Sequence, residues 1–117
     1  MKKVICSEKA PGAIGPYSQA TEAAGLVFVS GQLPIDAATG DMPEGIEAQA
    51  RQSLLNIQHI LEAAGLTMSH MVKTTVYLQD MSLFAGMNSV YATFFEGDYP
   101  ARAAFAVKAL PKDALVE

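Results

Sequence analysis

Residues 46–65 read IEAQARQSLLNIQHILEAAG and residues 72–79 read VKTTVYLQ, and these two stretches decide the fold. In the first, apolar residues recur at alternating spacings of four and three, the repeat of an amphipathic helix with one buried face. Gly65 follows the last of them and is typical of a helix C-terminus. In the second, β-branched or apolar residues alternate with more polar ones, which predicts a half-buried strand. A helix followed by a strand is therefore the centre of the expected fold.

The residues before this centre predict strands and a loop. Residues 18–24 are weakly strand-like, and residues 26–29 form a compact apolar run of the kind a buried strand shows. Residues 35–45 contain several turn formers and should be a surface loop that leads into the helix.

A second helix and two more strands are expected after residue 79. Asp80 or Ser82 can cap this helix, and its apolar residues recur at spacings of three, four and three. That apolar stripe consists of Phe84, Met87, Tyr91 and Phe94. Residues 103–110 alternate as a strand does, residues 111–113 form a turn, and residues 114–117 begin one more strand.

This order of elements predicts a single α+β domain over residues 1–117, with one mixed β-sheet and both helices on one face. The chain stops at Glu117 just as the last apolar strand begins, which leaves that strand too short to pair well. Two explanations are open: the C-terminal strand is truncated, which we favour, or a neighbouring subunit completes it.

Composition limits the class of protein. Hydrophobic residues make up 50% of the chain and charged residues only 17%, so we expect part of the apolar surface to meet a partner subunit. The net charge of −4 argues against nucleic acid and anionic membranes as partners. Cys6 is the lone cysteine, and the chain has neither a signal-peptide core nor an apolar stretch of membrane-spanning length. We therefore expect a cytoplasmic protein.

Arg102 is the first candidate functional residue. It follows Tyr99-Pro100-Ala101 at the predicted mouth of a strand of small residues, a rigid position from which a planar guanidinium can bind a carboxylate through two hydrogen bonds. A charge-assisted bond contributes about 1.5 to 3 kcal/mol. The alternative is an exposed arginine paired with Asp or Glu, and spacing alone does not decide between the two.

Glu117 and Asn88 are further candidates. If residues 103–110 and the strand from residue 114 are hairpin neighbours, Glu117 comes near Arg102 and could position a water molecule; otherwise it is a solvated charge at a strand end. Asn88 lies on or beside the apolar stripe of the second helix, where an amide needs a hydrogen-bond partner. That partner is either neighbouring backbone, or a ligand or the next subunit.

Other polar or small residues give weaker signals. Tyr17 and the pair Ser30-Gly31 place a phenol and an approachable backbone at strand ends, although turn geometry explains the glycine equally well. His59 and His70 have no partner at metal-ligand or catalytic spacing, so neither indicates a metal site.

Five short motifs stand out when the chain is taken as a whole. They are residues 10–19 (APGAIGPYSQ), 30–34 (SGQLP), 49–52 (QARQ), 72–76 (VKTTV) and 99–102 (YPAR). Together they closely resemble the reactive intermediate deaminase A (RidA) family, also called the YjgF/YER057c/UK114 family. The resemblance runs from about Ala10 to Glu117 without a large gap and includes LPKDALVE at residues 110–117.

The resemblance implies a chorismate-mutase-like fold and a homotrimer with ligand clefts between its subunits. It also implies a hydrolase that converts 2-imino acids, such as 2-iminobutanoate and 2-iminopropanoate, to 2-keto acids and ammonia, with no cofactor or metal. Arg102 matches the residue that holds the substrate carboxylate, and Glu117 the residue thought to activate the attacking water. The residues that match the rest of the cleft are Tyr17, Ser30, Gly31 and Asn88. The competing interpretation is a metabolite-binding regulatory or chaperone-like module without turnover.

Ala104 departs from the family pattern, in which a cysteine often stands two positions after the arginine. The absent thiol argues against covalent catalysis here, and Ala104 would contribute to substrate binding only through its backbone. The other departure is the final strand, which in the family follows the glutamate. Without it, Glu117 would be a frayed and poorly positioned base.

Overall fold

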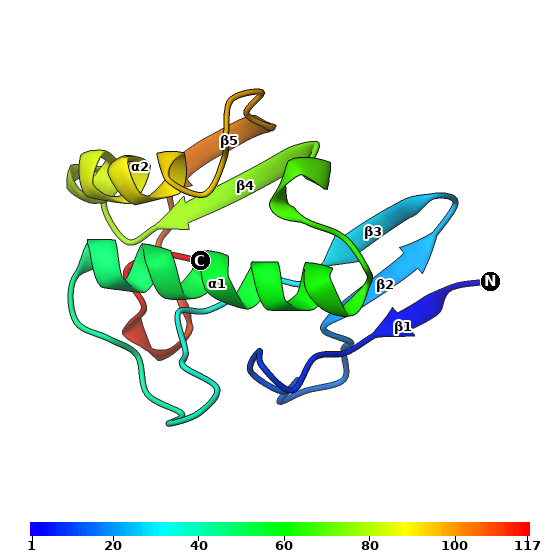
Figure 1. Cartoon of the computed structure of the whole chain (residues 1–117). Helices are drawn as coiled ribbons and strands as arrows, with labels where there is room; N and C mark the ends of the chain where they lie inside the picture. The colour runs from blue at the N-terminus through cyan, green and yellow to red at the C-terminus, as the bar shows by residue number, and fades with distance from the viewer.

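The computed structural model describes residues 1–117 and confirms the α+β class (Figure 1). The strands and helices are β1 (Lys3–Ile5), β2 (Ala20–Ala23), β3 (Leu26–Val29), α1 (Ile46–Ala63), β4 (Lys73–Leu78), α2 (Phe84–Ala92) and β5 (Ala101–Ala106). Short 3-10 turns lie at Met68–His70, Met81–Leu83 and Pro111–Asp113. Neither α-helix combines the length and apolar character that crossing a membrane requires.

The strands form two sheets instead of the single sheet that we expected. β1, β2 and β3 pair antiparallel in that order, and β4 pairs parallel with β5. The C-terminal residues run antiparallel along the other edge of β4, where Leu78 bridges Val116. Tyr77 and Glu117 exchange two backbone hydrogen bonds of 2.9 Å there. Strand directions are thus mixed, and β3 and β4 belong to separate sheets.

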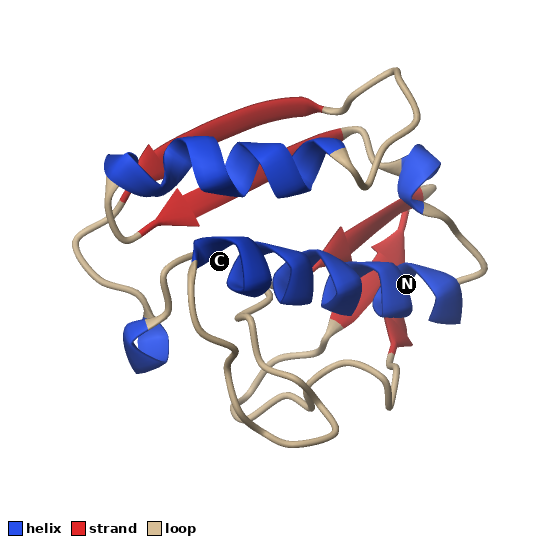
Figure 2. Ribbon diagram, turned by 60° about the vertical axis from the view of Figure 1, so that its left-hand side comes forward, coloured by secondary structure: helices blue, strands red, loops and turns tan.

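One face of α1 contacts both sheets, and in both ribbon views the two helices lie on the same side of the strands (Figure 1, Figure 2). Ile60 of α1 packs with a small cluster over β1 and β2. Leu54 and Leu61 join a larger cluster that includes Val76 and Leu78 of β4 and the buried side of α2. α1 therefore connects the two sheets through its apolar stripe.

The element boundaries largely follow the predicted signals. Gly65 has a φ of 75°, as a residue that ends a helix does, and Asp80 accepts a 2.8 Å bond from the Ser82 N–H, which makes Asp80 the cap. β5 begins at Ala101 instead of residue 103, because its pairing with β4 starts at Lys73. Arg102 therefore lies inside β5 and not at its mouth.

A groove of about 440 Å³ separates the two sheets. Its walls are the facing edges of β3 and β4, and side chains of α1 line it as well. Ser53 of α1 also lines the groove, and its buried hydroxyl has no hydrogen-bond partner. The same groove is also lined by three candidate site residues, namely Ser30, Gly31 and Glu117.

Candidate functional site

Arg102 extends from β5 onto α2 and is held there by three side chains. Its Nη1 donates a 2.6 Å hydrogen bond to Asn88 Oδ1. Its guanidinium carbon lies 4.7 Å from the ring centre of Tyr91 and 5.5 Å from that of Phe84, within cation–π range. Because the bond to Asn88 uses a single N–H, the remaining donors of the half-buried guanidinium are available to an anion.

The register of β4 and β5 explains why Arg102 faces α2. Arg102 is aligned with Thr74, and the Thr74 and Tyr91 hydroxyls lie 2.7 Å apart in a hydrogen bond. Tyr91 is itself buried, so this bond fixes the ring against which the guanidinium packs. Ala104, two residues further along β5, lies on the same face of the strand, and its methyl group packs against the core. We call Arg102, Asn88 and Ala104 the arginine half-site.

Glu117 lies at the opposite edge of β4, beside Gly31. A Cβ atom at position 31 would lie 3.0 Å from the Glu117 Cδ, so the close approach of this carboxyl depends on glycine. Burial raises the pKa of the Glu117 carboxyl above its usual range, because desolvation disfavours the charged form. A carboxyl with a raised pKa takes up a proton more readily than an exposed glutamate does.

Ser30, which precedes Gly31, is hydrogen-bonded to the loop that carries Tyr17. The Ser30 hydroxyl donates to the Ser18 carbonyl oxygen at 2.6 Å, and the Ser30 N–H donates to the Gln19 carbonyl oxygen at 2.9 Å. Tyr17, next to Ser18, is 49% exposed, so its ring is free to contact a ligand or another subunit. We call Tyr17, Ser30, Gly31 and Glu117 the carboxyl half-site.

The two half-sites do not meet within one chain, and the predicted hairpin between β5 and the C-terminal strand is wrong. β5 occupies one edge of β4 and residues 115–117 occupy the other, so β4 lies between Arg102 and Glu117. The side chains also point apart, because Arg102 is aligned with Thr74 and Glu117 with Tyr77, positions that face opposite sides of a strand. No ion pair joins Arg102 to Glu117.

No local pattern predicts a site role for Tyr91, Phe84 or Thr74. In the sequence, Tyr91 and Phe84 belong to an apolar stripe, and Thr74 is one position of an alternating strand. The available signal was spacing: Tyr91 lies three residues after Asn88, and Phe84 four before it, so all three share one face of a helix. An asparagine between two aromatic residues on one helix face is therefore the sequence signal for the place where Arg102 contacts α2.

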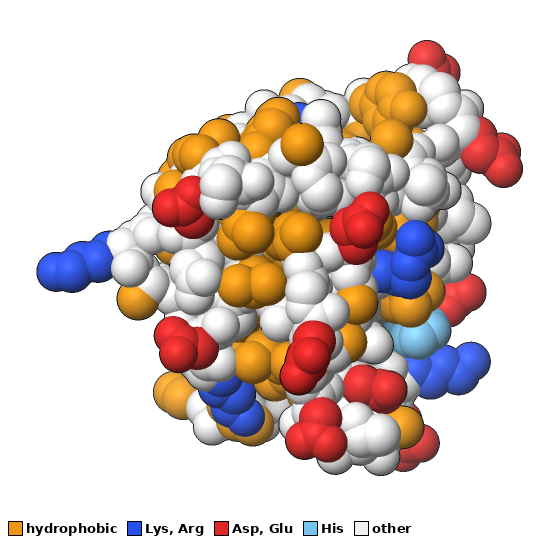
Figure 3. All heavy atoms as spheres, turned by 90° about the vertical axis from the view of Figure 1, so that its left-hand side faces the viewer, with side chains coloured by type: hydrophobic (Ala, Val, Ile, Leu, Met, Phe, Trp, Pro, Cys, Tyr) orange, Lys and Arg blue, Asp and Glu red, His pale blue; other side chains and the backbone are white.

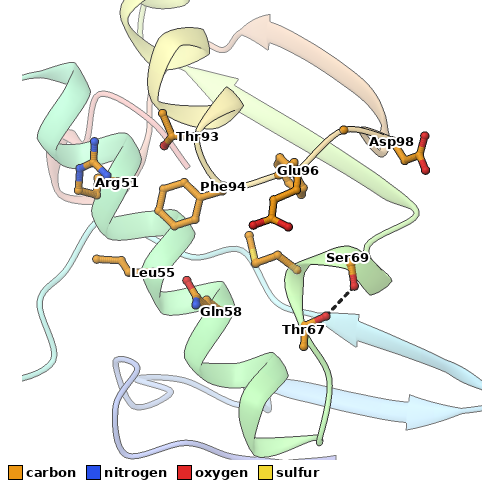
Figure 4. A pocket seen from close by; sticks show the side chains of 12 residues that line it. Arg51, Leu55, Gln58, Thr67, Ser69, Thr93, Phe94, Glu96 and Asp98 are labelled. Carbon is orange, nitrogen blue, oxygen red and sulfur yellow. Dashed lines mark hydrogen bonds between the residues drawn. The ribbon is translucent and has the colours of Figure 1, made fainter.

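A second, polar cleft of about 710 Å³ lies between α1 and the segment that follows α2 (Figure 4). Arg51 and Glu96 line it, together with Thr67 and Ser69, whose hydroxyls form a 2.7 Å hydrogen bond. None of the predicted site residues lies in this cleft. Nowhere in the chain do three His, Cys, Asp or Glu side chains gather in a way that could hold a metal ion.

The chain is a small α+β protein in which the arginine half-site and the carboxyl half-site lie at opposite edges of β4. A family described as endoribonuclease L-PSP matches residues 7–117. The chain belongs to this family, which is the YjgF/RidA family.

Relatives of known name extend this result. A RutC family protein of Pyrococcus horikoshii is 53% identical, covering 100% of this chain and 94% of the relative. The 2-iminobutanoate/2-iminopropanoate deaminase of Escherichia coli K12 is 45% identical over the same shares, 100% and 94%. The crystal structure of E. coli TdcF with bound serine is 43% identical, with a TM-score of 0.94 over 97% of this chain and 92% of that chain.

Proposed function

We propose that this protein is a hydrolase acting on C=N bonds, a deaminase that converts 2-iminobutanoate and 2-iminopropanoate to 2-keto acids and ammonia. The observation that carries the proposal is the Arg102 guanidinium, which is already oriented by Asn88 and Tyr91 and keeps N–H donors for a carboxylate. Deaminases of this name from mouse, Salmonella typhimurium and E. coli, 45–47% identical to the chain, support the choice of substrate.

The active site is formed between subunits of a homotrimer. Within one chain the arginine and carboxyl half-sites lie at opposite edges of β4, so a neighbouring subunit has to bring them together. Head-to-tail contacts close into a ring when the rotation between neighbouring subunits is a whole fraction of a turn, which is one third for a trimer. Large apolar side chains that one chain leaves exposed, including Phe28 at 58% and Phe105 at 45%, are available for such contacts.

The reaction uses one group from each half-site. Arg102 binds the substrate carboxylate, which fixes the adjacent imine carbon beside a water molecule held by Glu117 of the neighbouring subunit. Glu117 takes a proton from the water as the water oxygen bonds to the carbon of the protonated imine, and the C=N π electrons move to the nitrogen, which becomes an amino group. Glu117 then gives this proton to the amino group. The C–N bond breaks as the hydroxyl proton passes back to Glu117, which leaves the 2-keto acid, and the departing ammonia carries this last proton away as ammonium. Ala104 supplies no nucleophile, so no covalent intermediate is required.

A coupled assay tests the proposal. A threonine dehydratase generates 2-iminobutanoate in the presence of semicarbazide, which traps the imine before it hydrolyses. Adding the protein should speed 2-ketobutanoate release and reduce the trapped fraction, and Arg102→Ala should lose roughly a hundredfold or more of this effect. Ser89→Ala, an exposed residue of α2, is the matched control and should keep full activity. An inactive parent, or an Arg102→Ala variant with full activity, refutes the proposal.

The alternative is a metabolite-binding module without turnover, and the serine bound to E. coli TdcF is the observation that favours it. In that case 2-ketobutanoate or serine would raise the melting temperature of the protein while imine hydrolysis stayed at the uncatalysed rate. Action on RNA, which the family's description suggests, fits this chain poorly. Its net charge is −4, and on the face shown in Figure 3 acidic side chains outnumber scattered basic ones.

A further inference from the structure

Gln49, in the first turn of α1, holds the C-terminal residues through its side-chain amide. Its Oε1 accepts a 2.8 Å hydrogen bond from the Leu115 N–H. Its Nε2 donates a 3.0 Å bond to the Pro43 carbonyl oxygen in the loop before α1. Gln49 is 7% exposed, and these two bonds satisfy both ends of its buried amide, which offsets the cost of burying it.

Leu115 is thereby fixed from two sides. Its N–H bonds to Gln49 of α1, and its carbonyl oxygen accepts a 2.9 Å bond from the Gln79 N–H just beyond β4. The residues on either side of it, Ala114 at 0% and Val116 at 3% exposure, are buried. Glu117 follows Val116, so the position of the Glu117 backbone relative to α1 depends on the two hydrogen bonds that hold Leu115.

We propose that Gln49 is a positioning residue for the reaction: through Leu115 it holds Glu117 so that the carboxyl stays beside Gly31. This inference rests on the proposed function, in which Glu117 takes a proton from the attacking water. Gln49 itself lies in neither half-site. Its effect is transmitted by main chain, because a strand held at Leu115 leaves Glu117 few backbone conformations in which its pairing with Tyr77 survives.

Three variants separate positioning from general stability. Gln49→Met has similar length but offers Leu115 no acceptor. Gln49→Glu keeps the acceptor and loses the donor to Pro43. Gln52→Met is the matched control, because Gln52 is a second glutamine of α1, half-buried, that donates to Asn56 Oδ1 within its own helix at 2.9 Å.

Steady-state kinetics with 2-iminobutanoate give the first result. In Gln49→Met, kcat should fall roughly ten- to hundredfold, while KM changes little because Arg102 is untouched. Gln49→Glu should recover most of the lost kcat, and Gln52→Met should behave as the parent. A kcat of Gln49→Met equal to that of the parent, or a Gln49→Glu variant no better than Gln49→Met, overturns the proposal.

Two measurements do not need activity. Amide hydrogen exchange at Leu115 and Glu117 should be faster in Gln49→Met than in the parent or Gln52→Met. The pKa of the Glu117 carboxyl, followed by NMR titration, should move back toward its usual range in Gln49→Met as the carboxyl becomes more solvated. If the parent has no deaminase activity, the proposed function fails, and these two measurements still decide whether Gln49 positions Glu117: unchanged exchange and titration refute it.

Discussion

The Nη1 of Arg102 lies 2.6 Å from the Oδ1 of Asn88, so a neutral amide and not a carboxylate orients the guanidinium. An aspartate at this position would also hold the arginine, but it would neutralise its charge. With an amide as partner, the whole positive charge remains for a ligand. Asparagine therefore orients the Arg102 guanidinium without cancelling its positive charge.

Asn88→Asp should weaken binding of a carboxylate ligand more than Asn88→Ala does. The new carboxylate competes with the ligand for the same guanidinium, and we expect KM for the imine, or Kd for 2-ketobutanoate, to rise roughly tenfold or more. In Asn88→Ala the positive charge stays and only orientation is lost. Isothermal titration calorimetry with 2-ketobutanoate measures Kd for both variants, with Ser89→Ala as the control. Tighter ligand binding by Asn88→Asp would contradict this account.

Gly31→Ala should lower kcat with little loss of stability. The added Cβ would lie 3.0 Å from the Glu117 Cδ, so the carboxyl has to move by a few tenths of an ångström or more. Since it is the end of a flexible side chain, we expect the free energy of unfolding to change by less than about 1 kcal/mol. Gly12→Ala is the control, because no atom lies within 4 Å of its added Cβ. Equal kcat values for the two variants would show that the carboxyl's place is unimportant.

The raised pKa of Glu117 predicts two pH effects of opposite sense. Activity requires the carboxylate, so kcat should fall as pH decreases through the raised pKa, at higher pH than an exposed glutamate would give. The pH dependence of stability has the opposite sign. A carboxyl whose pKa is raised in the folded state contributes stability that is fully present below its unfolded pKa and is lost as pH rises through the folded pKa.

Glu117→Gln checks the stability effect. Urea unfolding at several pH values should show the variant gaining stability over the parent on the neutral side of that window. The difference should disappear at acidic pH, where the parent's carboxyl is protonated. A difference that does not depend on pH would mean that the folded and unfolded pKa values are equal.

Two buried polar residues of α1 should respond oppositely to alanine. The Ser53 hydroxyl has no partner, so Ser53→Ala should be neutral or stabilise the fold by up to about 1 kcal/mol. Asn56, at 0% exposure, donates bonds of 3.1 Å and 2.9 Å to the Leu33 and Ile35 carbonyl oxygens. Asn56→Ala should cost roughly 2 kcal/mol or more, because those carbonyls lose their donor. Thermal unfolding of both variants measures the contrast, and a larger loss for Ser53→Ala would reverse it.

Local sequence signals predicted the elements well and the contacts of site residues less well. The stripe of α1 and the cap at Asp80 depend on residues within one or two turns, which spacing reveals. The place of Arg102 within β5 depends on pairing with β4, a contact between residues far apart in sequence. Asn88 illustrates both: its position beside an apolar stripe marked it as unusual, but only the structure shows that its partner is Arg102.

The sequence by itself determined the two helices, the strand at β4, the α+β class and the identities of Arg102 and Glu117 as candidate groups. Tertiary structure alone decided that these two groups occupy opposite edges of β4 and form separate half-sites. The physical reason is that periodicity reports which face of an element is buried. Which edge of a strand each partner occupies is decided by long-range packing and by contacts such as that of Gln49 with Leu115, which no local pattern encodes.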